Sequence, residues 1–211
     1  MKIIIKDFLA SIILTVSLVE ITAATTIDLT SGTTGTTLFN QSFNETRAAD
    51  VTVLTPDLLV TSMTLSEFNI STTSGTIGAR IYNSDGSLHV AADLSVSSGF
   101  DQSVTIPIST ILEQGFTYRM GFFISAGLNG GSGDIFNPDP SGLAITPYSD
   151  STGSLQISGA FSFPDDTFPT NINGSLPLMT IEAHLVPEPA SLGLLTSGFV
   201  LIVALRKRFK G

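Results

Sequence analysis

The stretch Phe116-Thr-Tyr-Arg-Met-Gly-Phe-Phe-Ile124 carries the clearest structural pattern in this chain of 211 residues. Every second residue is apolar or aromatic, which matches the alternation of side chains between the two faces of a β-strand. The pattern is strict over nine residues, the length of a typical strand in a packed sheet. It predicts a strand whose core face carries Phe116, Tyr118, Met120, Phe122 and Ile124.

A β-hairpin is predicted immediately upstream. Thr76–Tyr82 and Ser87–Val90 read as strands, and Asn83-Ser84-Asp85-Gly86 between them is rich in residues that accept local hydrogen bonds and positive φ. We expect the first strand to point three residues toward the core and two outward: Ile77, Ala79 and Ile81 inward, Arg80 and Tyr82 outward.

Further strands are expected on both sides of this hairpin. In Leu59–Ile70 the residues Leu59, Thr61, Met63 and Leu65 share one face, and the apolar phase then shifts to Phe68 and Ile70, as at a β-bulge. Val104, Ile106 and Ile108 alternate, and Pro107 on the opposite face favours an edge strand. Ser109–Gln114 is expected to form a brief helical turn. The remaining candidates are Thr25–Leu29, Thr36–Phe39, Asp50–Thr55, Ala144–Thr146, Ser154–Phe163 and Pro177–Leu185.

The fold class follows from many short strands, turn residues between them and no amphipathic helix. The sequence predicts an all-β, antiparallel β-sandwich of jelly-roll-like type over residues 25–186, flanked by an N-terminal signal helix and a C-terminal transmembrane helix.

The charge of this body excludes one class of partner. Residues 25–186 contain three cations, Arg47, Arg80 and Arg119, and 15 acidic residues (the 18 of the chain less Asp7, Glu20 and Glu188), so their net charge is 3 − 15 = −12. Such a surface repels phosphate backbones, and we expect no nucleic-acid binding. The chain has no cysteine, which excludes disulfides, thiol catalysis and cysteine-ligated zinc.

The last 25 residues, 187–211, indicate the localisation of the protein. Pro187-Glu188-Pro189 interrupts any helix, Ala190–Leu205 is almost entirely apolar, and the basic residues Arg206, Lys207, Arg208 and Lys210 follow. Sixteen helical residues would span roughly 24 Å, a short but workable crossing of a hydrocarbon layer about 30 Å thick. The alternative is a C-terminal helix buried in the core. The apolar surface on all sides and the terminal basic cluster favour the membrane.

This tail resembles the PEP-CTERM sorting signal of bacterial surface proteins. Pro187, Glu188 and Pro189 match the motif, and residues 206–210 match its basic end. The resemblance implies export, transient anchoring with the C-terminus in the cytoplasm, and processing by an exosortase near Pro-Glu-Pro. The segment Thr76–Ile124 is loosely similar to the choice-of-anchor group of exported sandwich domains.

The N-terminus is consistent with the same route. Lys2 and Lys6 precede an apolar stretch, and Thr22-Ala23-Ala24 offers small residues to a signal peptidase, so residues 1–24 are predicted to be a signal peptide. An uncleaved N-terminal anchor is the alternative.

The sequence of the body gives little support for a catalytic activity. His89 and His184 are expected to be ordinary strand residues, and no nucleophile elbow, metalloprotease or phosphate-binding motif is present. Asp165-Asp166 is the only adjacent carboxylate pair, but it lies in a turn and would not converge on one sugar. We therefore predict that the protein is not an enzyme and needs no cofactor.

The long loop Gly127–Gly142 is the best candidate for a functional loop. Asp134, Asn137 and Asp139 could present oxygen atoms to calcium, although their spacing matches neither an EF-hand nor the nonapeptide calcium repeat. Sugar binding would have only Tyr82 and Tyr148 as stacking rings, because the chain has no Trp and Tyr118 faces the predicted core.

We expect an exported cell-surface or extracellular-matrix protein with a structural or adhesive role. Its expected partners are signal peptidase, an exosortase-type enzyme, membrane lipid and an exopolysaccharide. A polysaccharide- or calcium-binding module is the alternative, and a glycan or ester hydrolase is the less favoured one.

Overall fold

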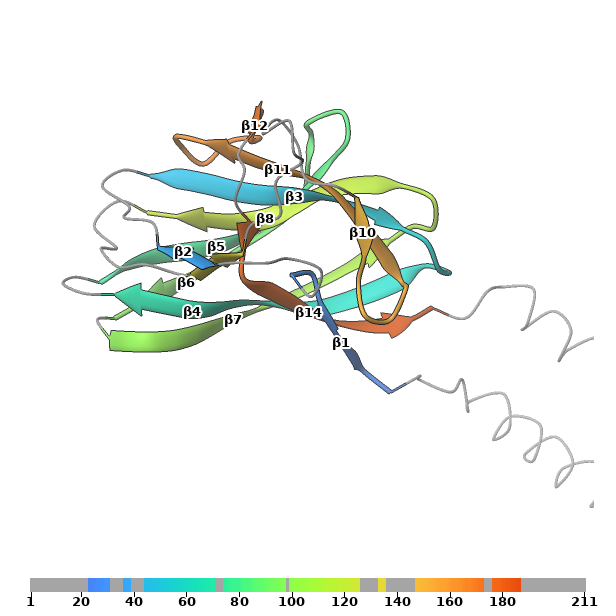
Figure 1. Cartoon of the computed structure of the whole chain (residues 1–211), viewed down its shortest axis with the longest axis horizontal. Coiled ribbons are helices and arrows are strands. Elements are labelled where there is room, and N and C mark those ends of the chain that lie inside the picture. Colours follow the sequence, from blue (N-terminus) through green and yellow to red (C-terminus); the bar gives the residue numbers. More distant parts are fainter. Residues whose placement is uncertain are drawn as a thin grey trace, which may run out of the picture.

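The computed structural model describes residues 23–30, 36–38, 44–70, 74–97, 99–125, 133–135, 147–172 and 176–186. Within these ranges every regular element is a β-strand (Figure 1). The strands are β1 Thr25–Asp28, β2 Thr36–Leu38, β3 Glu45–Val53, β4 Leu58–Ile70, β5 Gly75–Asn83, β6 Leu88–Val96, β7 Gly99–Leu112, β8 Thr117–Ile124, β9 Gly133–Ile135, β10 Tyr148–Ser149, β11 Leu155–Phe163, β12 Asn171–Ile172, β13 Leu176–Pro177 and β14 Met179–Leu185.

Two antiparallel sheets form the body, as predicted for the all-β class. The four-stranded sheet has the order β1-β14-β4-β7, and the seven-stranded sheet has the order β10-β11-β3-β8-β5-β6 with β12 paired to β11. A small sheet, β13-β9-β2, completes the described strands. The two large sheets lie as separate layers in Figure 1.

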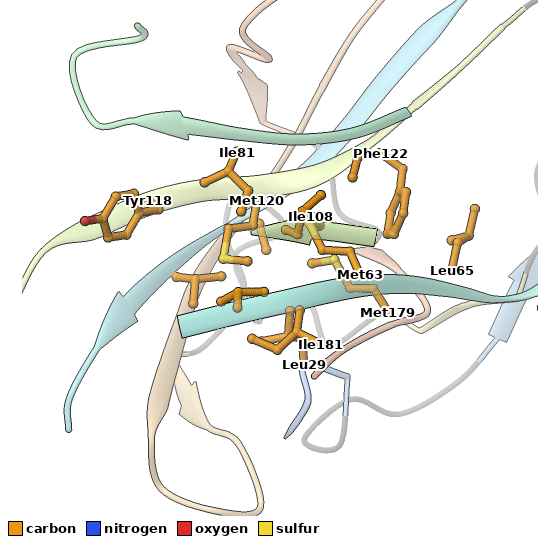
Figure 2. Packing of buried hydrophobic residues seen from close by; sticks show 14 of the residues in the cluster. Leu29, Met63, Leu65, Ile81, Ile108, Tyr118, Met120, Phe122, Met179 and Ile181 are labelled. Carbon is orange, nitrogen blue, oxygen red and sulfur yellow. The ribbon is translucent and has the colours of Figure 1, made fainter. Parts of the chain in front are cut away.

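The core fills the space between these two layers. Met63, Leu65 and Ile181 come from the four-stranded sheet, and Met120 and Phe122 come from the seven-stranded sheet (Figure 2). All five are at most 1% exposed, so each contributes roughly 1.5–3 kcal/mol of apolar burial. The core face of β8 is therefore the predicted one at Tyr118, Met120, Phe122 and Ile124.

Phe116 departs from that pattern. It precedes β8, and 57% of its surface is exposed. The N–H of Gly115 donates to the carbonyl of Val53, and the carbonyl of Phe116 accepts from the N–H of Val53. This turn carries Phe116 away from the core before the regular alternation begins.

The predicted hairpin is confirmed as β5 and β6. The N–H of Gly86 donates to the carbonyl of Asn83, and Asp85 Oδ1 accepts hydrogen bonds from the N–H and the hydroxyl of Ser87. Gly86 has φ of 88°, a conformation that glycine adopts without a steric cost.

The pairing of β4 with β7 shifts register at three places, of which one was predicted; one of the other two lies between Phe68 and Ile70. The pairing with β7 shifts between Leu65 and Phe68, as expected. A second shift falls at Thr61, which is skipped in the pairing with both β14 and β7. Leu58 and Val60 consequently face the core, whereas Leu59 and Thr61, expected on the core face, do not.

Two other expectations about local structure are corrected or confirmed around β7. The helical turn expected at Ser109–Gln114 is wrong, because β7 continues to Leu112 by pairing Thr110, Ile111 and Leu112 with β4. The edge position of this strand is confirmed, and Pro107 is exposed on its outer face. The strand expected at Ala144–Thr146 lies outside the described residues.

The folded body begins and ends at the same place. Thr25, the first residue of β1, pairs with Ala183 of β14, and the N–H of Val186 donates to the carbonyl of Asp57 at 2.8 Å. Asp57 Oδ1 in turn accepts a hydrogen bond from the N–H of Gln114. We call this end of the two layers, marked by Leu54–Asp57, Glu113–Phe116 and Leu185–Val186, the exit end.

Candidate functional site

The sorting motif and the basic tail predicted from the sequence lie outside the described residues, as do Asn137 and Asp139. Asp134 is placed in β9, where it pairs with Thr37 of β2 and Pro177 of β13. The part of the chain that the structure describes contains no group of three His, Cys, Asp or Glu residues arranged to hold a metal ion. The same part contains no helix long and apolar enough to cross a membrane.

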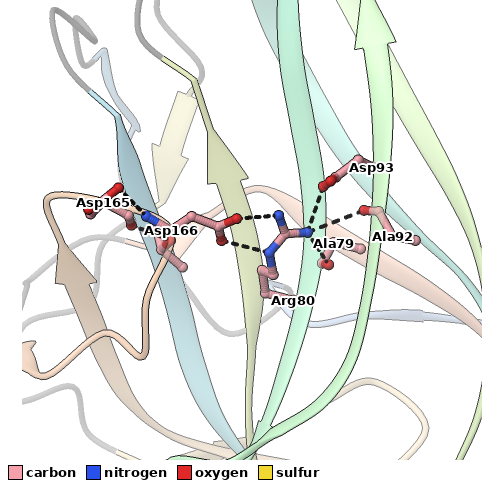
Figure 3. Close-up of polar contacts among 7 residues, drawn as sticks. Ala79, Arg80, Ala92, Asp93, Asp165 and Asp166 are labelled. Atoms are coloured by element: carbon pink, nitrogen blue, oxygen red, sulfur yellow. Dashed lines mark hydrogen bonds and ion pairs between the residues drawn. The ribbon is translucent and has the colours of Figure 1, made fainter.

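The most elaborate polar cluster lies on the outer face of the seven-stranded sheet and centres on Arg80. Its Nε and Nη2 donate to the two carboxylate oxygens of Asp166, at 2.7 and 2.6 Å (Figure 3). Its Nη1 lies 2.7 Å from Asp93 Oδ1 and also donates to the carbonyl of Ala79. One guanidinium group thus joins β5, β6 and the connection that follows β11.

Burial and charge act on Arg80 in opposite directions. Removal from water alone would lower its pKa, but the hydrogen bonds and negative charges of Asp166 and Asp93 outweigh that effect and raise the pKa above its usual value. The guanidinium therefore remains charged at any pH at which the fold exists, and the pair is a fixed structural element.

A second arginine occupies the next position along this face. Arg119 donates through Nε and Nη2 to Asp50, at 2.7 and 2.9 Å, and through Nη1 to the carbonyl of Pro169. Its guanidinium lies 3.4 Å from the ring centroid of Phe161 and 4.5 Å from that of Phe168, as cation–π contacts do.

The same connection covers both arginines. Asp166, Phe168 and Pro169 all belong to residues 164–170, which we call the covering segment. Phe168 also meets Tyr82 edge to face with ring centroids 5.5 Å apart. Arg80 and Tyr82, which were expected to point outward, do lie on the outer face, but only 4% and 5% of their surface is exposed. The outward direction is therefore confirmed, and the covering segment shields both side chains from solvent.

Sequence reasoning missed this cluster although its members were visible. The adjacent carboxylates Asp165 and Asp166 were expected in a turn and were not expected to converge on one ligand. Asp166 instead binds Arg80, while the carbonyl of Asp165 accepts from the hydroxyl of Thr46. The only available signal was an acidic pair in a body with three cations, and no sequence spacing connects Asp166 to Arg80, 86 residues away.

The third arginine lies on the other side of the sheet. Arg47 Nε donates to Glu45 Oε1 at 2.9 Å, and both side chains are largely buried. By strand alternation these two residues share the face of β3 that carries Ala49 and Val51 in the core. Each of the three arginines of the body is therefore paired with a carboxylate and has a structural role.

The candidate sugar-stacking tyrosines do not present their rings to solvent as a platform. Tyr82 lies beneath Phe168, and the half-buried Tyr148 donates its hydroxyl to the carbonyl of Leu29 at 2.6 Å. His89 Nε2 lies 2.8 Å from Thr110 Oγ1, and this contact links the edge strands β6 and β7. The His89 ring also packs near Tyr118. This geometry gives His89 a structural contact between the layers.

Alkaline pH is expected to unfold this body through its tyrosines. Burial is the main cause that raises the pKa of Tyr148, and the charge of Asp28 adds to it; burial likewise raises the pKa of Tyr82 and of Tyr118. Below the unfolded-state pKa of about 10 the tyrosines are neutral in both states and their stabilising effect is fully present. Above it the unfolded chain loses protons that the folded chain retains, so stability falls as pH rises.

Urea unfolding of the full chain in non-ionic detergent at pH 8 and pH 11 measures this loss. We expect a lower midpoint at pH 11, with a slope of up to about 1.4 kcal/mol per pH unit for each shifted tyrosine. Tyr148→Phe should reduce the slope, although it also removes the hydrogen bond to Leu29. Equal midpoints at the two pH values would contradict the prediction.

Comparison with known proteins leaves the family of the chain open. No family model and no curated protein matches it. Among solved structures it is similar to a chain of the T13 particle of infectious bursal disease virus, at 12% identity and a TM-score of 0.33, covering 88% of this chain and 47% of that one. A chain from the Gx strain of the same virus matches at 14% identity and a TM-score of 0.20, over 90% and 48%. The chain thus spans about half the length of these structures, and at such TM-scores the likeness carries no functional argument.

Proposed function

We propose that this chain is an exported bacterial surface or extracellular-matrix protein that an exosortase-type system sorts, with a structural or adhesive role and no catalysis. Signal peptidase would remove residues 1–24. The apolar segment 190–205 would hold the chain in the membrane with residues 206–210 in the cytoplasm and the body outside. In finer detail, the two sheets would form a jelly-roll-like sandwich between these two terminal helices.

The observation that carries the proposal is the sequence Pro187-Glu188-Pro189, the apolar run and the basic end in that order. The fold supports it in one respect. β14 ends at Leu185, two residues before Pro187, so the body can be complete before the sorting segment starts. The motif thus follows the last described strand directly in the sequence.

The non-catalytic part of the proposal rests on how the described polar side chains are used. The carboxylates of Asp166 and Asp50 each accept two hydrogen bonds from an arginine, and Asp150 accepts from the backbone of Leu155 and Thr152. These groups are committed to turns and ion pairs, which suits a rigid display scaffold. An exopolysaccharide of the matrix is the partner we propose for that scaffold, and the proposal assigns it no cofactor.

Deletion of residues 187–211 tests the sorting step. In a bacterial host that contains an exosortase, the full chain should show a drop in mass after export, and the deleted chain should show only removal of the signal peptide. Intact mass spectrometry of the envelope and secreted fractions measures both.

A matched variant separates processing from anchoring. Replacing Pro187, Glu188 and Pro189 by alanine keeps the apolar run and the basic end, so this chain should remain membrane-bound and unprocessed. Identical processing of all three chains would overturn the proposed sorting.

A further inference from the structure

The strongest unassigned feature outside the arginine cluster is the distribution of exposed apolar side chains. Among the residues that the structure describes, six large hydrophobic side chains are more than a third exposed. Five of them lie at the exit end or on strand ends adjoining it: Leu54, Leu88, Ile111, Phe116 and Leu185. Leu94 lies farther along β6, opposite Ile77.

The pairing registers place these five side chains together at one end. Leu185 pairs with Leu58 and Ile111 with Leu59, so both lie in the last rows of the four-stranded sheet. Leu54 and Phe116 flank Val53, whose N–H bonds to the carbonyl of Phe116. Leu88 pairs with Tyr82 beside the turn of the β5–β6 hairpin. Tyr82 in turn pairs with Arg119, near the start of β8. The two chain ends of the body, Thr25 and Val186, emerge among them.

The length of chain after Val186 limits how far this end can lie from a membrane. Only four residue steps separate Val186 from Ala190, which begins the apolar run, and fully extended they reach about 13–14 Å. The headgroup zone on one side of a bilayer occupies roughly 5–8 Å of that distance. The apolar run is also about 6 Å shorter than the hydrocarbon layer, which draws the linker toward the lipid.

We propose that, while the chain is anchored, the exit end rests on the outer face of the bilayer with Leu54, Leu88, Ile111, Phe116 and Leu185 in contact with the headgroup zone. The inference rests on the anchoring in the proposed function. Apolar and aromatic side chains are favoured at this depth. The seated orientation points the opposite ends of the sheets, where β8 ends at Ile124, away from the membrane.

The charges at this end specify the lipid. Asp57, Asp85 and Glu113 lie in the same turns as the apolar residues. Asp57 and Asp85 accept backbone hydrogen bonds and remain part of the surface. Anionic headgroups would repel these carboxylates, so the occupant is a zwitterionic lipid surface.

The absence of cysteine makes the test direct. Phe116→Cys places one thiol at the exit end, and Leu94→Cys is the matched control on an exposed leucine away from it. Each full-length variant is labelled with an environment-sensitive fluorophore and reconstituted into phosphatidylcholine vesicles that contain a headgroup spin-labelled lipid. Quenching at Phe116→Cys should be about half of the signal and should be negligible at Leu94→Cys, because only the first label shares the headgroup zone.

The outcomes separate this inference from the function on which it rests. If the chain floats with vesicles but the label at Phe116→Cys is not quenched, or both labels are quenched equally, the orientation is wrong and anchoring stands. If a disulfide-linked dimer forms through Phe116→Cys without quenching, the surface belongs to a second copy and the inference is wrong. If the chain does not float with vesicles, the anchoring fails and the inference with it. Adding anionic lipid should reduce the quenching.

Discussion

Gly121→Ala is expected to abolish cooperative folding of the body or to lower its unfolding free energy by more than about 3 kcal/mol. Gly121 lies in β8 opposite Ala48 of β3. A Cβ atom added there would overlap the carbonyl oxygen of Arg47 and lie 2.5 Å from the Cα of Ala48. Both obstacles are backbone atoms in the middle of the seven-stranded sheet, so relief would require separating two paired strands.

The measurement is urea unfolding of the full chain in non-ionic detergent, followed by tyrosine fluorescence and circular dichroism. Gly115→Ala is the matched control, because its added Cβ has no neighbour within 4 Å and only its φ of +81° opposes a side chain. We expect this control to lose about 1–2 kcal/mol. If Gly121→Ala unfolded at the same urea concentration as Gly115→Ala, the close approach of β3 and β8 would be wrong.

The second large effect is expected at the Arg80–Asp166 pair. Arg80→Met should lower the unfolding free energy by about 2–3 kcal/mol, less than the 3–5 kcal/mol typical of a fully buried pair. The expected loss of unfolding free energy is smaller because the side chains of Asp166 and Asp93 are 38% and 57% exposed and can be rehydrated. Asp166→Asn should cost less than Arg80→Met, because Asp93 still holds the guanidinium.

A double-mutant cycle isolates the contact itself. The Arg80→Met and Asp166→Asn variants are combined, and their coupling energy is read from the same urea transitions. We expect coupling of about 1 kcal/mol or more for this bidentate geometry. Limited proteolysis of Asp166→Asn should also cut within residues 164–170 before the rest of the body. Purely additive effects with an intact covering segment would show that the ion pair does not hold that segment in place.

Local patterns in the sequence predicted the parts of the fold that depend on neighbours along the chain. The alternation in β8 and the turn residues of the β5–β6 hairpin specify a strand face and a register without reference to anything distant. Pro107 identified an edge strand because its missing N–H is tolerated only there. The all-β class followed from the same signals.

Contacts between distant residues accounted for the errors. Thr61 becomes an extra residue only because β4 is paired on both sides, with β14 and β7, so its effect on the inward face cannot be read from β4 alone. The ion pair of Arg80 was missed for the same reason, since Asp166 reaches it only through tertiary structure. The sorting motif at Pro187–Pro189 and the basic tail remain predictions of the sequence, to be tested by the deletion described above.

The position of β14 between β1 and β4 has a mechanical consequence for a chain held at Val186. A pull on the opposite end of the body would act along β14, at right angles to the ladder bonds that join it to both neighbours. Those bonds would carry the load together and would have to break nearly at once. A pull between Thr25 and Val186 would instead open the β1–β14 ladder one bond after another. The layout of the strands thus resists force transmitted from the outer end toward the tether and yields to force applied between the two chain ends.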